Sequence, residues 1–343
     1  MKIGLAFDLK PAVPESPDLP DDQYEEYDSP ETIDSLAGEL EKLGHSVVRL
    51  GGGREFLRNI LETPVDLVFN ISEGQGRYRS REAQVPAILE MLGIPYVGSD
   101  PLTLALCLDK PSAKRVAQQA KVSTPAYMVI ENFDDLNNLG NSPLEFPVIV
   151  KPAFEGSSKG IHQRSRVDSP SNLPQIVRET LEVYRQPVLV EEFIPGIEVT
   201  VGLIGHPVPE VVGVLEVVPQ DGTGYDFMYT LEVKRNWRQL VRYRCPPQLP
   251  QSCVEQLVTA ARRLFHALGC RDLARLDFRV TQDLRLYFIE ANPLPGLSPS
   301  YSDLPVMGAL VDWDYPRIIR SVLNSALQRQ GLGTHQNAYS AVV

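Results

Sequence analysis

The sequence predicts an α/β protein in which the first part forms a parallel sheet and the last part an antiparallel sheet. Short apolar strands alternate with amphipathic helices over residues 3–97, and this alternation indicates a parallel sheet covered by helices. After Gly196, strands 199–204, 210–218 and 240–244 follow one another with no helix between them, which is typical of antiparallel pairing. The length of 343 residues exceeds what one small core uses, so we expect two or three lobes.

The N-terminal part contains the clearest helix start. Residues 3–7 form a short apolar strand, and a polar loop rich in proline and acidic residues follows at 10–28. Ser29 can cap the next helix, Pro30 occupies its first turn, and an apolar stripe leads to Gly44. The predicted alternation continues with strand 47–50, helix 55–61, strand 65–70, helix 83–92 and strand 95–97.

Ligands bind at the carboxyl ends of parallel strands, so we expect Asp8 and residues 70–76 at the mouth of a site. Residues 70–82 are rich in glycine and arginine. They fit either an anion-binding turn or the solvated loop that precedes a helix, because glycine-rich stretches are weak signals alone.

The middle of the chain predicts a phosphate-binding element. A helix at about 111–120 follows Asp109-Lys110, and a strand at 127–130 comes next. Lys151 ends an apolar strand at 146–152, where a buried base is unusual. The Gly-Ser-Ser turn that follows offers free amides and hydroxyls to a phosphate; the alternative is an ordinary hairpin turn with an incidental lysine. Helix 173–184 completes this part.

The last part begins after a bend at Pro195-Gly196, which separates strand 187–192 from the new sheet. The polar stretch 221–242 is too long for a tight hairpin and predicts a functional lid. A helix at 251–268 with an apolar stripe ends at Gly269. We expect a last helix at about 315–327 and a frayed tail at 331–343.

A hairpin between strands 275–280 and 286–292 carries the chemistry. If it turns at Asp283-Leu284, Asp277 lies opposite Glu290 and Arg275 opposite Asn292, with all four side chains on one face. Facing carboxylates repel unless a cation lies between them, and carboxylate and amide oxygens suit Mg²⁺ held through substrate phosphates. A solvated hairpin face is the alternative.

Composition excludes several classes. The chain is 43% hydrophobic and 22% charged, as in a soluble globular protein, and its net charge of −11 disfavours nucleic-acid or membrane-surface binding. Four cysteines show no metal-binding spacing, and no apolar run is long enough to span a bilayer. We therefore expect a cytoplasmic protein with reduced cysteines.

Five motifs occur in order. They are Asp109-Lys110, Lys151-Pro152 followed by Glu155-Gly156-Ser157-Ser158, Glu191-Glu192-Phe193-Ile194 followed by Glu198, Arg275 with Asp277, and Glu290-Ala291-Asn292 followed by Gly296. Together they resemble the motifs of ATP-grasp ligases, and most of all those of the D-alanine–D-alanine ligases. The resemblance implies an N-terminal α/β domain at 1–110, a central lid domain at 111–195 and a C-terminal catalytic domain at 196–330.

The resemblance also implies site residues. ATP would bind through Lys110, Lys151, Ser157, Ser158, Glu191, Glu192, Phe193, Ile194, Glu198, Lys234 and Ile289. Asp277, Glu290 and Asn292 would hold two Mg²⁺ ions, for which Mn²⁺ can substitute. Arg275 and the amide of Gly296 would stabilise an oxyanion, and Ser157 would act from the glycine-rich loop.

Other positions depart from the family. Its N-terminal glutamate, which binds the amino group of the first D-alanine, falls at about Tyr27, and its mobile-loop tyrosine is Arg235. Its histidine-containing loop is replaced by a stretch that includes Glu73. One extra residue follows Gly296, and we expect Ser302 to bind the carboxylate of the acceptor.

These departures disfavour D-alanine as the first substrate. Five arginines would add positive charge at the mouth of the site: Arg77, Arg79, Arg81, Arg235 and Arg238. Guanidinium groups pair with carboxylates in bidentate fashion, so the hypothesis is a larger or more acidic amino acid or peptide. The alternative is that several of these arginines are simply solvated.

The predicted function is therefore an ATP-dependent carboxylate–amine ligase that forms a peptide-like bond through an acyl phosphate. Amino acids or peptides would be its substrates, and the family suggests a homodimer. Two alternatives stay open: an ester-forming ligase with a hydroxyl acceptor, and a nucleotide-binding regulatory protein that no longer ligates. The complete set of Lys151, Arg275, Asp277, Glu290 and Asn292 argues against the last.

Overall fold

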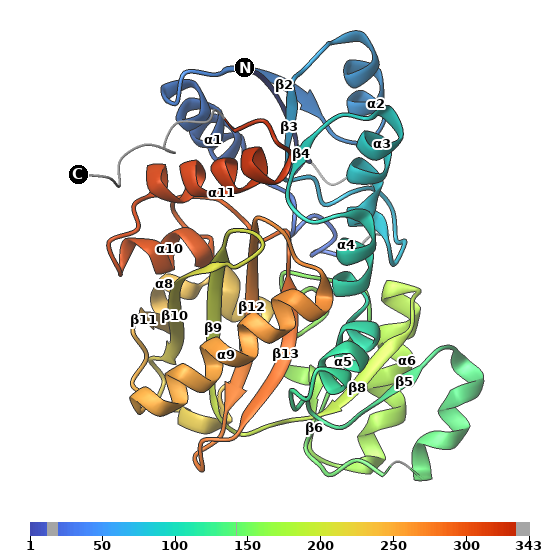
Figure 1. Ribbon diagram of the computed structural model, residues 1–343. Coiled ribbons are helices and arrows are strands. Elements are labelled where there is room, and N and C mark those ends of the chain that lie inside the picture. Colours follow the sequence, from blue (N-terminus) through green and yellow to red (C-terminus); the bar gives the residue numbers. More distant parts are fainter. Residues whose placement is uncertain (12–19, 142, 334–343) are drawn as a thin grey trace.

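The computed structural model describes residues 1–11, 20–141 and 143–333, and their strands form three sheets (Figure 1). The sheets use residues 2–97, 127–192 and 197–292 in turn. The domain boundaries expected at 110, 195 and 330 stay predictions. Most of the expected tail, residues 334–343, lies outside the described residues. No helix in the described ranges has the length and apolarity needed to cross a membrane.

The N-terminal sheet is parallel, as predicted, with strand order β2-β1-β3-β4. Ser29 caps α1 by accepting the amide hydrogen of Thr32, which confirms the predicted helix start. Its strands are β1 (Lys2–Ala6), β2 (Ser46–Gly51), β3 (Leu67–Asn70) and β4 (Tyr96–Val97), and its helices are α1 (Pro30–Lys42), α2 (Gly53–Glu62), the 3₁₀ turn η1 (Arg81–Ala83) and α3 (Gln84–Leu92).

The central sheet is antiparallel and has the order β5-β8-β6-β7. Its elements are β5 (Tyr127–Ile130), η2 (Phe133–Asn141), β6 (Val148–Pro152), η3 (Gln163–Ser165), β7 (Arg166–Val167), η4 (Pro170–Asn172), α6 (Leu173–Tyr184) and β8 (Val188–Glu192). Two helices precede it, α4 (Pro101–Leu108) and α5 (Lys110–Gln119), and Asp109 ends the first and caps the second. The sequence analysis missed α4, because its nearly continuous apolar run has no amphipathic period.

The C-terminal sheet is antiparallel with order β11-β10-β9-β12-β13. Its elements are β9 (Ile197–Ile204), β10 (Glu210–Pro219), η5 (Gly224–Asp226), α7 (Leu231–Arg235), α8 (Trp237–Leu240), β11 (Val241–Arg244), α9 (Gln251–Leu268), β12 (Leu273–Val280), β13 (Leu286–Asn292), α10 (Asp303–Ala309) and α11 (Tyr315–Arg329). The segment 221–242 was predicted as a loop and proves partly helical, because Thr230 caps a short turn of α7. The sequence analysis also missed α10.

The hairpin of β12 and β13 has the predicted facing pairs: Asp277 lies opposite Glu290 and Arg275 opposite Asn292. The strand pairing near the turn differs from the expected one, because Val280 lies opposite Leu286, one residue away from its expected partner. A β-bulge between Asp277 and Phe278 restores the predicted pairs. Bulges are common beside active sites because they re-aim side chains.

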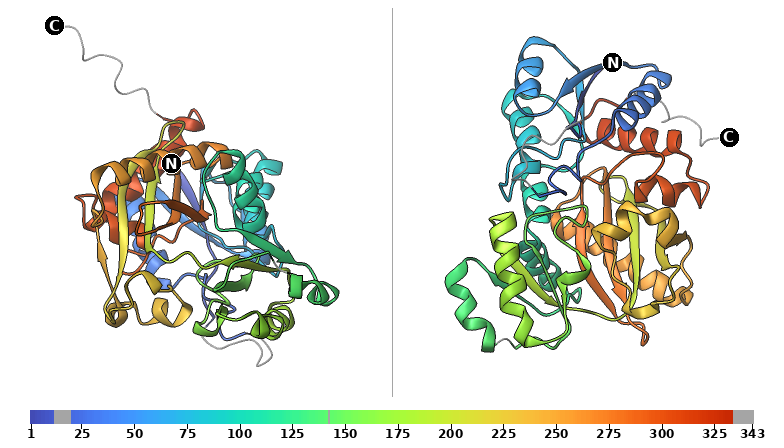
Figure 2. Two further views of the ribbon diagram at one scale, coloured as in Figure 1. Left: turned by 90° about the horizontal axis from the view of Figure 1, so that it is seen from below. Right: turned by 180° about the vertical axis from the view of Figure 1, so that it is seen from behind.

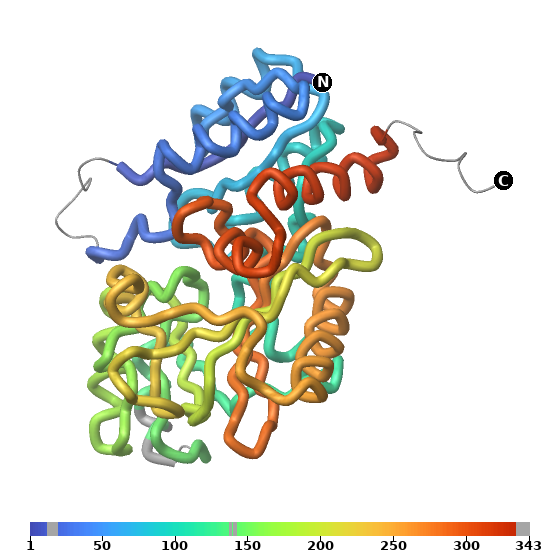
Figure 3. The backbone as a smooth tube through the Cα atoms, turned by 90° about the vertical axis from the view of Figure 1, so that its left-hand side faces the viewer, coloured from blue at the N-terminus to red at the C-terminus, as the bar shows by residue number. Residues whose placement is uncertain are grey.

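Helix α11 joins the N-terminal and C-terminal lobes and lies between them in Figures 1 and 3. Its Arg329 donates to both oxygens of Asp272, with the shorter contact at 2.6 Å, and to the carbonyl oxygen of Tyr96 at 2.9 Å. Asp272 is fully buried and also accepts the amide hydrogen of Gly98 at 2.8 Å. The view from behind in Figure 2 shows the central part of the chain (green) below the N-terminal lobe and beside the C-terminal part (yellow and orange).

We expect Asp272→Asn to destabilise the fold by about 3 kcal/mol, because it leaves the guanidinium of Arg329 without its buried counter-charge. Asparagine tolerates the left-handed backbone at this position (φ 63°), so the loss of stability measures the missing charge and not backbone strain. Urea unfolding measures it. The control Asp283→Asn breaks an exposed ion pair with Arg285 and should cost under about 1 kcal/mol. Equal losses in the two variants would contradict the assignment.

Candidate active site

A cavity of about 290 Å³ lies where the N-terminal lobe meets the glycine-rich loop and the C-terminal hairpin. Its walls include four groups of residues from separate parts of the chain: 25–28 before α1, 156–157 after β6, 234–235 with 237–238 in α7 and α8, and 290–296 at the end of β13. The volume is near the lower end of the range of about 300–1,000 Å³ for small-molecule pockets. The cavity therefore suits a ligand of amino-acid size beside a nucleotide.

The four predicted hairpin residues lie together, and all of them except Asp277 line the cavity. Nε and Nη2 of Arg275 lie 3.0 and 2.9 Å from the two carboxylate oxygens of Asp277. The side-chain amide of Asn292 donates to the same carboxylate at 3.1 Å. Asp303 accepts from Nη1 of Arg275 at 2.6 Å, and the two partners hold the guanidinium plane fixed.

The donor set of these hairpin residues fits a divalent cation bound together with phosphate. Burial and the facing Glu290 raise the pKa of Asp277, although Arg275 opposes the shift. Burial also opposes ionisation of Glu290, but Lys110 and Lys151 lower its pKa to about 2. Among the described residues, the amide oxygen of Asn292 accepts no hydrogen bond. Hard oxygen atoms of this kind suit Mg²⁺.

The two lysines predicted to meet phosphates are buried and paired. Lys110 donates to the carbonyl oxygen of Glu155 and lies 3.3 Å from Glu290, and Lys151 pairs with Glu191. The sequence analysis missed Lys114, which is fully buried and lies 2.7 Å from Glu191. Burial lowers the pKa of Lys114 to about 8 despite that carboxylate. Lys114 could have been found from its position four residues after Lys110, because this spacing places both lysines on one face of α5.

Four of the residues predicted to form the nucleotide slot, Glu191 to Ile194, lie at the end of β8 and directly after it. The carboxylate of Glu191 is occupied by two lysines, and its backbone lies between Tyr127 of β5 and Ile149 of β6. The ring of Phe193 lies between the guanidinium groups of Arg166 and Arg279, at 4.5 and 4.8 Å. Burial raises the pKa of Glu198 to about 7, although Arg279 lies 3.5 Å away.

The other predicted slot residues are less enclosed. Glu192 accepts the amide hydrogen of Glu145 at 2.9 Å, and Ile194 and Ile289 are half-buried.

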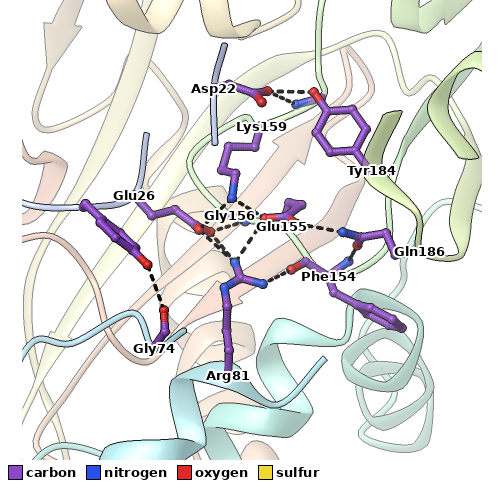
Figure 4. A network of polar contacts seen from close by, with 12 residues as sticks. Asp22, Glu26, Gly74, Arg81, Phe154, Glu155, Gly156, Lys159, Tyr184 and Gln186 are labelled. Carbon is purple, nitrogen blue, oxygen red and sulfur yellow. Dashed lines mark hydrogen bonds and ion pairs between the residues drawn. The ribbon is translucent and has the colours of Figure 1, made fainter. Parts of the chain in front are cut away.

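A network of charges fixes the glycine-rich loop against the N-terminal lobe (Figure 4). The carboxylate of Glu26 accepts from Arg81 with both oxygens at 2.8 Å, from the amide of Gly156 at 2.6 Å and from Lys159 at 3.1 Å. Burial opposes its ionisation, but Arg81 and Lys159 lower the pKa of Glu26 to about 2. Glu155 pairs with the same two cations, so two carboxylates and two cations balance.

A second contact supports the same loop. Asp22 accepts the amide hydrogen of Gly160 and the hydroxyl of Tyr184, each at 2.8 Å. Ser157 and Ser158 have left-handed backbones, with φ of 51° and 60°. Such strain in non-glycine residues clusters at ligand-binding loops.

The segment 221–242 closes the cavity from the other side, and the N-terminal segment holds it there. Arg235 lies 2.9 Å from Asp21 and 3.0 Å from Glu25. Lys234, the predicted phosphate lysine, lines the cavity, and burial lowers its pKa. The lid and the glycine-rich loop thus share one anchor.

The sequence analysis missed this anchoring role of residues 21–26. Acidic side chains recur there at a spacing of four, as Asp21 with Glu25 and Asp22 with Glu26. The first pair faces the lid and the second faces the glycine-rich loop. This spacing of four residues, directly after Pro20, is the feature of the sequence that could have revealed the two anchoring pairs.

The expected excess of arginine charge at the mouth is wrong for two of the five residues. Arg81 and Arg235 are neutralised by carboxylates of the protein itself, as described above. Arg79 is largely exposed, 3.6 Å from Asp109, and Arg77 lines a neighbouring groove. Arg238 lines the cavity and stacks on Trp237 at 4.7 Å.

The remaining predicted substrate residues do line the cavity. The hydroxyl of Tyr27 donates to the carbonyl oxygen of Gly74 at 3.2 Å. Ser302 accepts the amide hydrogen of Ser298 at 3.0 Å, and its hydroxyl would meet any side chain placed at Gly296. Their predicted roles in substrate binding stay predictions.

Three further carboxylates, those of Asp28, Glu73 and Glu82, line the N-terminal side of the cavity, and we call this group the acidic corner. Burial and then Asp8 raise the pKa of Asp28 to about 7. Burial, with the charges of Glu26 and Glu82, raises the pKa of Glu73 well above its usual range. Burial also raises the pKa of Glu82 to about 8 despite Arg81. Two of these residues, Asp28 and Glu82, were not singled out from the sequence.

The three sheets, the cavity between them and the paired lysines, arginine and carboxylates define a ligase of the ATP-grasp class. A family profile described as "D-ala D-ala ligase C-terminus" matches residues 116–324. The D-alanine–D-alanine ligase of Carboxydothermus hydrogenoformans is 31% identical over 78% of this chain and 83% of its own. The uncharacterized protein y4sG of Sinorhizobium fredii is 32% identical over 86% of this chain and 87% of its own.

The solved structures agree in fold. The D-alanine–D-alanine ligase of Bacillus anthracis, in complex with ATP, superposes with a TM-score of 0.71 and 22% identity, covering 97% of this chain and 100% of that one. The chain therefore belongs to the D-alanine–D-alanine ligase family of the ATP-grasp superfamily. It is homologous to ATP-dependent ligases that form C–N bonds.

We expect Asp28→Asn to stabilise the protein increasingly as pH rises from 5 to about 7. A carboxylate whose pKa is raised on folding binds its proton more tightly in the folded state, so its stability contribution falls from about pH 4 up to the folded pKa of about 7. Asparagine cannot titrate, so its advantage grows by up to about 1.4 kcal/mol per pH unit.

Thermal unfolding of both proteins across this range measures the difference. The control is Tyr27→Phe, beside Asp28: burial raises the pKa of that phenol far above the range, so its effect on stability should not vary with pH. A constant difference between Asp28→Asn and the wild type would contradict the prediction.

Proposed function

We propose that the protein is an ATP-dependent ligase that joins the carboxylate of one amino acid or peptide to the amine of a second. The supporting observation is the cluster of Arg275, Asp277, Glu290 and Asn292 on the hairpin, beside Lys110 at the cavity. A protein that only bound nucleotide would need the lysines but not an arginine fixed between two carboxylates.

The proposed reaction has two steps. A carboxylate oxygen of the first substrate attacks the γ-phosphorus of ATP, the bond to ADP breaks and an acyl phosphate forms. The amine of the second substrate then attacks the acyl carbon, phosphate leaves with the bonding electrons, and the nitrogen loses a proton. No side-chain nucleophile is involved, so positioning and charge stabilisation carry the rate.

The chain's own residues have defined tasks in this proposal. Lys110, Lys151 and Lys234 meet phosphate oxygens, and Ser157 and Ser158 cover them from the glycine-rich loop. Arg275 and the amide of Gly296 stabilise the oxyanion at the acyl carbon. Magnesium, which we propose binds as two ions and which Mn²⁺ can replace, neutralises the phosphates when bound. Asp277, Glu290 and Asn292 would hold it.

The substrates are proposed only as a class. Relatives named D-alanine–D-alanine ligase make D-amino acids the first compounds to test, although Arg235 and Tyr27 depart from the family. The homodimer and the cytoplasmic location stay predictions, and sedimentation of the purified protein measures the first.

We expect phosphate release from ATP and Mg²⁺ when suitable pairs of D- or L-amino acids are supplied, with a product lighter than the pair by one water. We expect Arg275→Lys to lower kcat by about 100-fold, because lysine cannot reproduce the bidentate geometry. Arg285→Lys, an exposed pair on the same hairpin, is the matched control and should keep full activity. Silence across the panel with nucleotide binding intact would contradict the proposed function.

A further inference from the structure

The acidic corner is a part of the cavity to which no ligand has yet been assigned. Its three residues come from different segments: Asp28 precedes α1, Glu73 follows β3 and Glu82 lies in η1. All three line the cavity, and Lys110, which lines it too, acts on Glu82 by its charge. The charges of Asp28 and Glu82 both act on Glu73, so the group is close-set.

The three carboxylates have no partner within the described part of the chain. None accepts a side-chain hydrogen bond or forms an ion pair there, and the side chain of Glu82 is only 8% exposed. The two cations nearest Glu82 are Arg81 and Lys110, and both have closer partners. Burial makes it costly to ionise an unpaired carboxyl group here and raises the pKa of all three, and a cation from outside would favour the ionised form.

Glu26 cannot serve in its place. A carboxylate offers about four lone-pair sites, and Arg81, Lys159 and the amide of Gly156 already fill them. Taking a substrate ammonium there would break a buried network that fixes the glycine-rich loop. The α-ammonium of an amino acid must therefore bind among Asp28, Glu73 and Glu82.

One ammonium does not pair all three groups of this corner. It can take the place of the proton on one of them, whereas Glu26 and Glu155 show that this protein meets each ionised buried carboxylate with about one cation. A second cationic group on the substrate would allow a second of the three groups to ionise. The arginines that would favour an acidic substrate are neutralised, as shown above for Arg81 and Arg235.

We propose that the acidic corner binds a second ammonium or guanidinium group, so that the amino acid that supplies the carboxylate has a basic side chain. This inference rests on the proposed ligase function and names its substrate class.

The test compares amino acids that differ only in the terminal amine. Lysine is set against norleucine and ornithine against norvaline, each in D and L form, with ATP, Mg²⁺ and a fixed panel of amine acceptors. We expect kcat/KM for phosphate release to be about 10- to 100-fold higher for the basic member, the range of a hydrogen bond to a charged group. Equal or faster reaction of the neutral member would overturn the proposal and leave the ligase function standing.

Single substitutions in the acidic corner test whether the preference for the basic amino acid arises there. Glu82→Gln and Glu73→Gln keep the shape and remove the charge, and each should reduce the preference for lysine over norleucine towards one. The matched control Glu62→Gln, exposed at the end of α2, should keep the preference. An unchanged preference in both corner variants would overturn the assignment.

Binding is measured separately by calorimetry of the wild type with ADP and Mg²⁺. Tighter binding of lysine than of norleucine supports the subsite, whether or not the enzyme turns over. If binding shows this preference but no phosphate is released, only the proposed ligase function is contradicted. Equal binding of the two overturns the subsite.

Discussion

The carboxylate of Glu26 is the contact on which the arrangement of the cavity depends. It accepts hydrogen bonds from the N-terminal lobe through Arg81 and from the glycine-rich loop through Gly156 and Lys159. The side chains of Glu26 and Arg81 are only 4% and 3% exposed, so water cannot replace either partner. Removing one member of such a network leaves an uncompensated buried charge, which costs about 3–5 kcal/mol. The loop is therefore positioned before any nucleotide arrives.

That arrangement divides the cavity by charge. At the hairpin, Lys110 and Arg275 meet Glu290 and Asp277 in pairs, and phosphate with its metal can enter without leaving a charge unmatched. At the acidic corner the carboxyl groups outnumber the cations, because Arg81 is fully committed to Glu26 and Glu155, and burial raises the pKa of each group. A substrate with a carboxylate at one end and an amine at the other would be oriented by this difference alone, with its carboxylate towards the nucleotide.

Contacts between residues close together in the chain could be predicted from the sequence, and contacts between distant residues could not. The facing of Asp277 and Glu290 was predictable because alternation along strands and a nearby turn nearly fix it, although a longer turn and a bulge replace the expected regular register. The five ordered motifs likewise identified the family. The contacts of Glu26, Arg81 and Lys159 were not predictable in the same way. Their partners are 55 to 133 residues apart, and no local pattern in the sequence specifies which acid meets which base.

The two loops that cover the cavity share one anchor but differ in strength. Arg235, whose side chain is 37% exposed, holds the lid through Asp21 (71% exposed) and Glu25 (13% exposed), and an exposed pair such as that with Asp21 contributes about 0–1 kcal/mol. The glycine-rich loop is held by buried charges and by Asp22 on the same short segment. We therefore expect opening to cost least on the lid side, so that a ligand would reach the acidic corner past Arg235 while the glycine-rich loop stays in place.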